Sequence, residues 1–178
     1  PVNGIESGCV SANGAGTDFS CQNGLIGGDN IAINSLRTAN DLPGLNNAGE
    51  LALVLNLDEP GNDTNAVLTD LYLAIFSPTG ALLGNYQYMG PDLSIDEDPG
   101  IGSAGTVFTL DAAQQLQAMQ DCPDLTQCGF GGGVQFAAGT TQGGPETLFL
   151  SFVADGVIPP VTIAEPGTLA LFGLALVG

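Results

Sequence analysis

The side chains best suited to chemistry in this chain are its acidic ones. Nineteen Asp and Glu residues face a single basic residue, Arg37, and no His, so the net charge is −18 at pH 7. Asp92, Asp96, Glu97 and Asp98 form an acidic run whose carboxylate oxygens are ligands that Ca2+ prefers. A second set would add ligands if its loop came close: Asp58, Glu59, Asp63 and Asp70. Neither run has EF-hand spacing, so a Ca2+ site and a solvated acidic loop are both open interpretations.

The residue types that the chain lacks exclude most catalytic designs. With no His and no Lys, it cannot build a Ser-His-Asp triad, a Schiff base or a lysine phosphate grip. Two carboxylates alone can hydrolyse a glycoside, but a sugar cleft is hard to build without Trp and with 6% aromatic residues. We therefore expect no enzymatic activity. The negative charge also argues against nucleic acid as a partner.

Four cysteines fall into two local pairs in an acidic sequence of the kind found in exported proteins. Cys9, Cys21, Cys122 and Cys128 allow three disulfide connectivities, and we predict Cys9 with Cys21 and Cys122 with Cys128. Each of these bonds would close a short loop that contains Gly or Pro. A four-cysteine zinc site is the alternative, but the gaps of eleven and five residues do not match the usual tight knuckles.

The body, residues 31–156, is predicted to be an all-β domain, an antiparallel β-sandwich with one short helix. Leu51, Leu53, Leu55 and Leu57 alternate with other residues and indicate a strand at 50–58. The segment 69–77 is apolar on both faces, which favours a central strand. Further strands are expected at four segments: 81–88, after a turn at 77–80; 106–110; 134–138; and 146–154.

Three other parts of the chain are an N-terminal loop region, a glycine-rich stretch and a short helix. Residues 1–30 are rich in Gly, Asn and Ser and are predicted to form a loop region held by the first disulfide. The glycine-rich stretch 129–133 is predicted to be the most flexible part of the body, or to lie against a neighbouring backbone. Asp111 is predicted to cap a helix at 112–120, with Leu116 and Met119 on its narrow apolar side.

The C-terminal end combines a Pro-rich linker, 157–166, with an apolar run, 167–178. The linker ends in Ala164-Glu165-Pro166, and the run that follows contains no charged residue. These features resemble the C-terminal sorting signal of the PEP-CTERM proteins, which are bacterial substrates of exosortases. The stretches 102–114 and 143–150 also look like recurrent parts of PEP-CTERM ectodomains. The resemblance implies a bacterial protein that is extracellular or bound to the cell surface, with Glu165 and Pro166 in the sorting motif and an exosortase or sorting protease as partner.

The apolar run sets the functional expectation. A helix over these twelve residues is about 18 Å long, whereas crossing a bilayer core takes about 30 Å. We expect its large side chains to bury themselves against other copies of the chain: Leu169, Leu171, Phe172, Leu174, Leu176 and Val177. The sequence thus predicts a structural protein of the cell surface, extracellular matrix or biofilm matrix, self-assembling into filaments and needing no cofactor. The alternative is an adhesion module that binds Ca2+ or polysaccharide. Because the chain begins at Pro1 rather than Met, we also expect a removed leader peptide.

Overall fold

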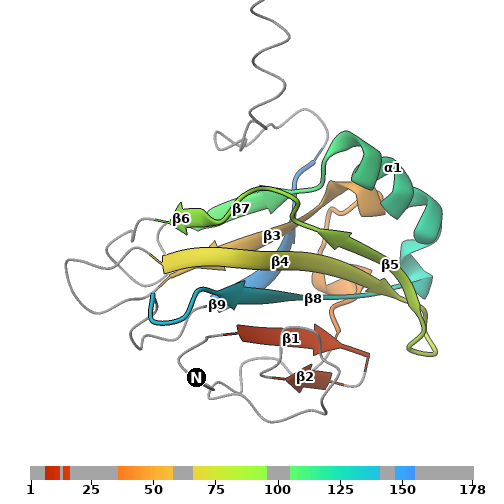
Figure 1. Cartoon of the computed structure of the whole chain (residues 1–178). Coiled ribbons are helices and arrows are strands. Elements are labelled where there is room, and N and C mark those ends of the chain that lie inside the picture. The colour runs from red at the N-terminus through yellow and green to blue at the C-terminus, as the bar shows by residue number, and fades with distance from the viewer. Residues whose placement is uncertain are drawn as a thin grey trace, which may run out of the picture.

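The described part of the chain is an antiparallel β-sandwich with one α-helix at its side (Figure 1). The computed structural model describes residues 7–12, 14–16, 36–57, 66–95, 105–140 and 147–154. Two sheets pack face to face across an apolar core, which confirms the all-β prediction. The sorting motif Glu165 and Pro166 and the apolar run after it lie outside the described residues.

We call the larger sheet the front sheet and the smaller one the rear sheet. The front sheet has the strand order β2 (Gly14–Gly16), β1 (Ser7–Ser11), β8 (Gly129–Phe136), β4 (Ala66–Phe76) and β5 (Leu82–Gln87), and β6 (Leu93–Ile95) pairs with β4. The rear sheet has the order β7 (Thr106–Thr109), β3 (Leu51–Asn56) and β9 (Thr147–Phe152). Every pairing in both sheets is antiparallel.

β3 forms the centre of the rear sheet, and its alternating leucines face the core as predicted. Leu51 and Leu55 are 1% exposed, and Leu53 and Leu57 are 6% exposed. Leu is only a moderate strand former, so this strand is stabilised chiefly by burial of its side chains against the front sheet. The same inward alternation holds on β9, where Leu148, Leu150 and Phe152 pack against the core.

β4 is a central strand of the front sheet, between β8 and β5, and buries both of its faces, as its sequence predicted. Leu71, Leu73 and Ile75 belong to the core between the sheets, whereas Tyr72, Ala74 and Phe76 form a second cluster on the outer face. A turn of Ser77 to Gly80 then leads into β5, and Gly80 adopts a φ of 83° there. A left-handed backbone at this position favours glycine, which explains the residue found in the hairpin.

The glycine-rich stretch 129–133 was predicted to be the most flexible part of the body. It instead forms the first five residues of the buried strand β8. It lies between β4 on one side and β1 with the Arg37 bridge on the other. Leu36 packs over the stretch, since a Cβ on Gly129 would stand 2.7 Å from its Cδ1 atom. A Cβ on Gly131 would strike the carbonyl oxygen of Val10. The alternative expectation, that the glycines permit close backbone approach, is therefore confirmed.

The helix α1 (Ala112–Asp121) begins where the sequence predicted, because the Asp111 carboxylate accepts a hydrogen bond from the Gln114 N–H at 2.8 Å. Its predicted apolar side, however, does not face the body. Leu116 is 59% exposed and Met119 is 36% exposed, whereas the small residue Ala118 is buried. Polar anchors set this orientation: Gln114 donates to the Gln87 carbonyl, and Asp121 accepts from Tyr86.

The N-terminal region also differs from the predicted loop. Within residues 1–30, β1 and β2 form a hairpin, and β1 joins the edge of β8. The strand sequence is rich in small residues, so it lacks the strong apolar alternation by which strands are recognised. β1 is instead specified by the partner strand β8, which is distant in sequence.

Candidate functional site

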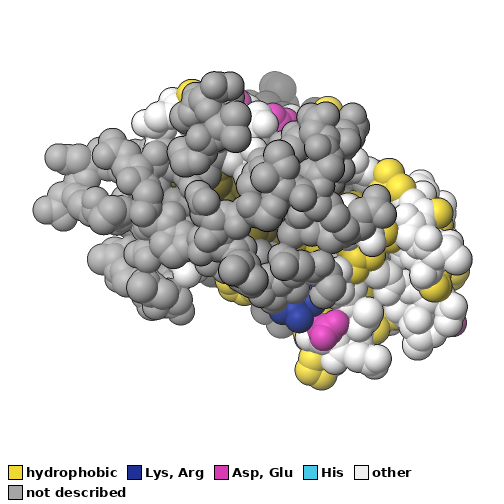
Figure 2. Space-filling model, turned by 90° about the horizontal axis from the view of Figure 1, so that it is seen from below, with side chains coloured by type: hydrophobic (Ala, Val, Ile, Leu, Met, Phe, Trp, Pro, Cys, Tyr) yellow, Lys and Arg dark blue, Asp and Glu magenta, His cyan; other side chains and the backbone are white. Residues whose placement is uncertain are grey.

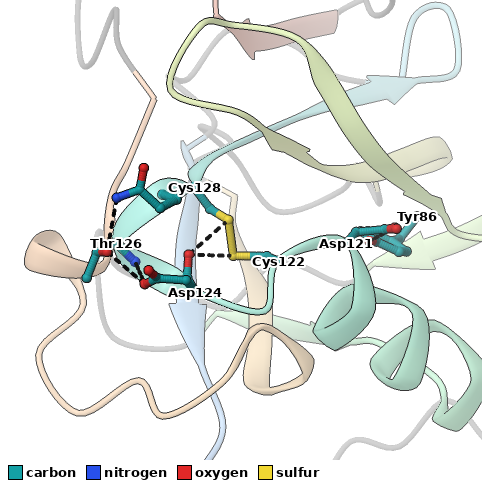
Figure 3. The surroundings of a disulfide bond; sticks show 7 residues. Tyr86, Asp121, Cys122, Asp124, Thr126 and Cys128 are labelled. Atoms are coloured by element: carbon teal, nitrogen blue, oxygen red, sulfur yellow. Dashed lines mark hydrogen bonds between the residues drawn. A yellow bond between two sulfur atoms is a disulfide. The ribbon is translucent and has the colours of Figure 1, made fainter.

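One of the two predicted disulfides is present and lies at the junction of the helix with the front sheet. Cys122 and Cys128 are bonded, with Cα atoms 6.2 Å apart, and both are buried (Figure 3). They join the end of α1 to the start of β8. The carbonyl oxygen of Asp124 lies 3.6 Å from Sγ of Cys122 and 3.4 Å from Sγ of Cys128. Because bonded sulfurs carry no proton, these are close contacts and not true hydrogen bonds.

The second predicted disulfide involves a cysteine that the structure does not describe. Cys9 is buried on β1, and none of the cysteines within the described ranges is free. Its predicted partner, Cys21, lies outside those ranges. The pairing of Cys9 with Cys21 therefore stays a prediction.

A polar loop supports the Cys122–Cys128 bond. The Thr126 hydroxyl donates to Oδ1 of Asp124 at 2.7 Å, and the Thr126 N–H donates to the same oxygen at 3.0 Å. These two hydrogen bonds, the hydroxyl first, hold the pKa of Asp124 below its usual value. Asp124 thereby caps the short 3-10 helix Leu125–Gln127. Its role is to shape the loop between the two cysteines.

Tyr86 and Asp121 form the second polar contact between α1 and the front sheet. The Tyr86 hydroxyl donates to Oδ2 of Asp121 at 2.6 Å, and Gln117 donates to the other carboxylate oxygen at 2.9 Å. Burial raises the pKa of Tyr86 well above its ordinary value, and the hydrogen bond to Asp121 adds to the rise. Gly84 leaves room for this pair, because a Cβ there would lie 2.6 Å from Oδ2 of Asp121. The pair fastens the helix to β5.

The structure describes only part of the predicted acidic site. Asp92 is exposed just before β6, whereas Asp96, Glu97 and Asp98 lie outside the described residues. No group of three or more Asp, Glu, Cys or His side chains able to hold a metal occurs in the part of the chain that the structure describes. The flanks of the two acidic segments do meet, since Ala66 pairs with Ile95 at one end of the front sheet. Asp70 is distant from that contact along β4 and accepts a hydrogen bond from Gln135 at 3.4 Å.

Two other charged groups are engaged in local structure. Glu50 is 5% exposed, and its carboxylate accepts hydrogen bonds from the Asn46 N–H at 2.9 Å and from the Asn47 side chain at 3.0 Å. Arg37 lies 3.7 Å from the carboxylate of Asp41 on the surface, and the pKa of Asp41 is lowered chiefly by the Thr38 N–H. The basic side chain in Figure 2 is Arg37, because the sequence contains no other.

The most distinctive surface feature is a set of exposed apolar side chains on uncharged segments. They lie on or beside β5, α1 and β9: Leu82, Leu83, Met89, Leu116, Met119 and Phe149. Residues 71–91, 112–120 and 147–154, which carry them, contain no charged residue in a chain of net charge −18. The described surface in Figure 2 likewise shows mostly apolar and uncharged polar groups. The sequence analysis did not predict that these side chains are exposed, although the absence of charged residues from the three segments was a signal of it.

In comparisons with known proteins, no protein-family model, no curated protein and no solved structure matches the chain. Among the residues with described positions, no helix has the length and apolar character needed to cross a membrane.

Proposed function

We propose that the protein is a non-enzymatic structural subunit that assembles with other copies of itself into filaments at the bacterial cell surface or in the extracellular matrix. The apolar C-terminal run, residues 167–178, is the main assembly element. An exosortase or sorting protease would act on Glu165 and Pro166 during export. The β-sandwich is the folded body that presents further assembly contacts.

One observation carries the proposal: large apolar side chains are exposed on uncharged segments of a strongly acidic chain. Two molecules of charge −18 repel each other, so they can associate only where the local charge is low. Leu82 is 57% exposed, Leu116 is 59% exposed and Phe149 is 44% exposed, each on such a segment. Exposed apolar side chains on such segments offer surface that two copies can bury together.

The test adds charge to the C-terminal run. Replacing Leu171 and Leu174 with Asp is expected to release monomers with an intact body, as measured by sedimentation velocity and electron microscopy. The control replaces Val161 and Ile163 with Asp, which exchanges two apolar residues of the linker for the same charge and is expected to leave assemblies intact. Wild-type protein that is monomeric at all concentrations would refute the proposed function. Intact assemblies from the Leu171 and Leu174 variant would refute the C-terminal run as its main assembly element.

A second candidate is an adhesion module that binds Ca2+ or polysaccharide. The pairing of Ala66 with Ile95 favours it, because the two acidic segments leave the sheet from adjacent strand ends. Ca2+ needs about six to eight oxygen ligands, which two loops together can supply. Calorimetric titration with CaCl2 tests this candidate, with the variant Asp96→Asn, Glu97→Gln, Asp98→Asn as comparison. Saturable heat that the variant loses would support it, and equal signals from both proteins would exclude these carboxylates as ligands.

A further inference from the structure

The free edges of the two sheets differ in how well they are protected against pairing with another chain. Natural sheets protect an edge strand by making it short, by a β-bulge, by charged residues or Pro, or by covering it with a helix. Within the described residues, β2 and β6 are three residues long and β7 is four. β5 is longer, but its register shifts opposite Phe76, and α1 lies against it through the Gln114 to Gln87 hydrogen bond.

β9 has none of these protections among the described residues. It runs for six residues, Thr147–Phe152, and pairs with β3 in an unbroken register. Its sequence, Thr-Leu-Phe-Leu-Ser-Phe, contains no charged residue, no Pro and no Gly. Short uncharged segments that are apolar and aromatic and lack Pro and Gly add readily to another strand. Phe149 also stands 44% exposed on the outer face of this strand.

The ladder between β3 and β9 determines which backbone groups are directed outward. The Val153 N–H donates to the Glu50 carbonyl at 2.8 Å, in register with the pairing of Phe152 and Leu51. Backbone groups alternate in direction along a strand, so those of Thr147, Phe149 and Ser151 are directed toward β3. Those of Leu148, Leu150 and Phe152 are therefore directed toward the free edge.

We propose that β9 is a self-pairing edge: two copies of the chain join their β9 strands antiparallel, which makes one continuous sheet from two rear sheets. The partner is a second copy because this arrangement matches the strand to itself. A two-fold axis at Leu150 sets Leu148 opposite Phe152 of the other copy and forms about six backbone hydrogen bonds.

The absence of charge on this segment allows a second copy of the same acidic chain to be the partner. Two chains of net charge −18 meet here along residues 147–154, which carry no charge. In the same register, Phe149 of each copy lies opposite Ser151 of the other on the outer face of the joined sheet. An aromatic ring and a small hydroxyl side chain on directly opposite residues pack together without a clash. The contact is small, so it gains most when another contact holds the copies together.

The inference deepens the proposed function by naming a second contact, and the two can be tested separately. The variant Phe149→Glu, Ser151→Glu places carboxylates opposite each other across the proposed pair, and like charges directly opposite destabilise strand pairing. We expect the concentration for half-assembly of the full-length chain to rise about tenfold or more, as measured by sedimentation velocity.

Two further variants control for charge and for folding. Thr109→Glu, Ala112→Glu adds the same charge at exposed positions on β7 and α1 and is expected to leave assembly unchanged. Phe149→Lys, Ser151→Glu places opposite charges across the two-fold pair and is expected to restore assembly. Circular dichroism and thermal midpoints confirm that each variant is folded before its assembly is compared.

The outcomes separate the two proposals. Loss of assembly in the Glu–Glu variant and its recovery in the Lys–Glu variant would support β9 pairing. Wild-type assembly by a folded Glu–Glu variant, or loss in the Lys–Glu variant, would overturn β9 pairing and leave the C-terminal proposal standing. If Leu171→Asp, Leu174→Asp assembles normally while Glu–Glu does not, β9 pairing stands and the C-terminal run is not the main assembly element. Wild-type protein that never associates would overturn both.

Discussion

β8 and β9 are both uncharged antiparallel strands, yet they occupy opposite positions in the molecule. β8 is central, with β4 along one side and β1 with the Arg37 bridge along the other. Its glycines leave room for Leu36 and for the Val10 carbonyl. β9 pairs with β3 alone among the described strands and exposes Phe149.

The difference shows that an uncharged strand can be specified in two ways. The position of β8 is determined by its neighbours, since its glycines have no side chains and permit close contact on both sides. β9 is placed by its own alternating side chains, which bury Leu148 and Leu150 only partly, and one of its edges has no partner strand among the described residues. Substitutions should therefore act on folding in β8 and on association in β9.

The largest effect is expected from a side chain at Gly131. In Gly131→Val the Cβ would strike the Val10 carbonyl oxygen and stand 2.9 Å from Cδ2 of Leu36, so the strand cannot keep its place. We expect a loss of about 3 kcal/mol or more in the free energy of unfolding, measured by urea denaturation. The matched change Ser151→Val in β9 should stay within about 0.5 kcal/mol. Equal midpoints for the two variants would contradict the comparison.

Truncation of the aromatic residues gives a contrast of comparable size. Phe130 on β8 is 1% exposed and fills the core, so Phe130→Ala should cost about 3 to 5 kcal/mol through lost burial and a cavity. Phe149 on β9 is 44% exposed, and Phe149→Ala should cost less than about 1 kcal/mol. Denaturation of both proteins under conditions that keep them monomeric checks the difference. A large loss for Phe149→Ala would mean that its exposed ring is part of the folded core.

The disulfide at the start of β8 should contribute a smaller amount. Replacing Cys122 and Cys128 with Ser removes a short closed loop, and we expect about 2 to 3 kcal/mol less stability. Denaturation with and without reductant measures it, since reductant should weaken the wild type more than the variant. Thiol titration of the denatured, unreduced wild type should detect no free thiol. Two free thiols would exclude the predicted Cys9–Cys21 bond.

The smallest effect concerns β5, the edge strand that is fastened to α1. The pKa of Tyr86 is raised in the folded state, so the protonated hydroxyl stabilises the fold. This contribution is fully present below the unfolded value of about 10 and is lost as the pH rises above it. We expect the urea midpoint of the wild type to fall above pH 10 more steeply than that of Tyr86→Phe. Parallel slopes for the two proteins would show that the hydroxyl has no such role.

The sequence predicted those elements whose own residues specify them. The leucines of β3, the two apolar faces of β4, the Ser77 to Gly80 turn and the Asp111 cap all carry local signals, and each of these predictions is confirmed. The Cys122–Cys128 bond is also confirmed, because both its cysteines lie close together in the sequence.

The errors arose where distant partners decide the outcome. β8 looked flexible because glycine carries no strand signal, yet β4 and β1 hold it in place. Leu116 and Met119 looked like the buried side of α1, but the hydrogen bonds of Gln114 and Asp121 turn the helix the other way. The position of β9 at the edge of the described rear sheet was equally hard to predict, because it depends on which other strands are present.

The order of the strands along the chain has a consequence for the timing of folding. Leu51 of β3 pairs with Phe152, 101 positions later, and Cys9 of β1 pairs with Gly133, 124 positions later. Long loops must close before these contacts form, which slows folding. During synthesis, which starts at the N-terminus, β3 has no β9 to pair with until almost the whole body has been made. During that interval β3 presents an edge that β9 of any copy fits, so slow completion favours exchange of β9 between molecules.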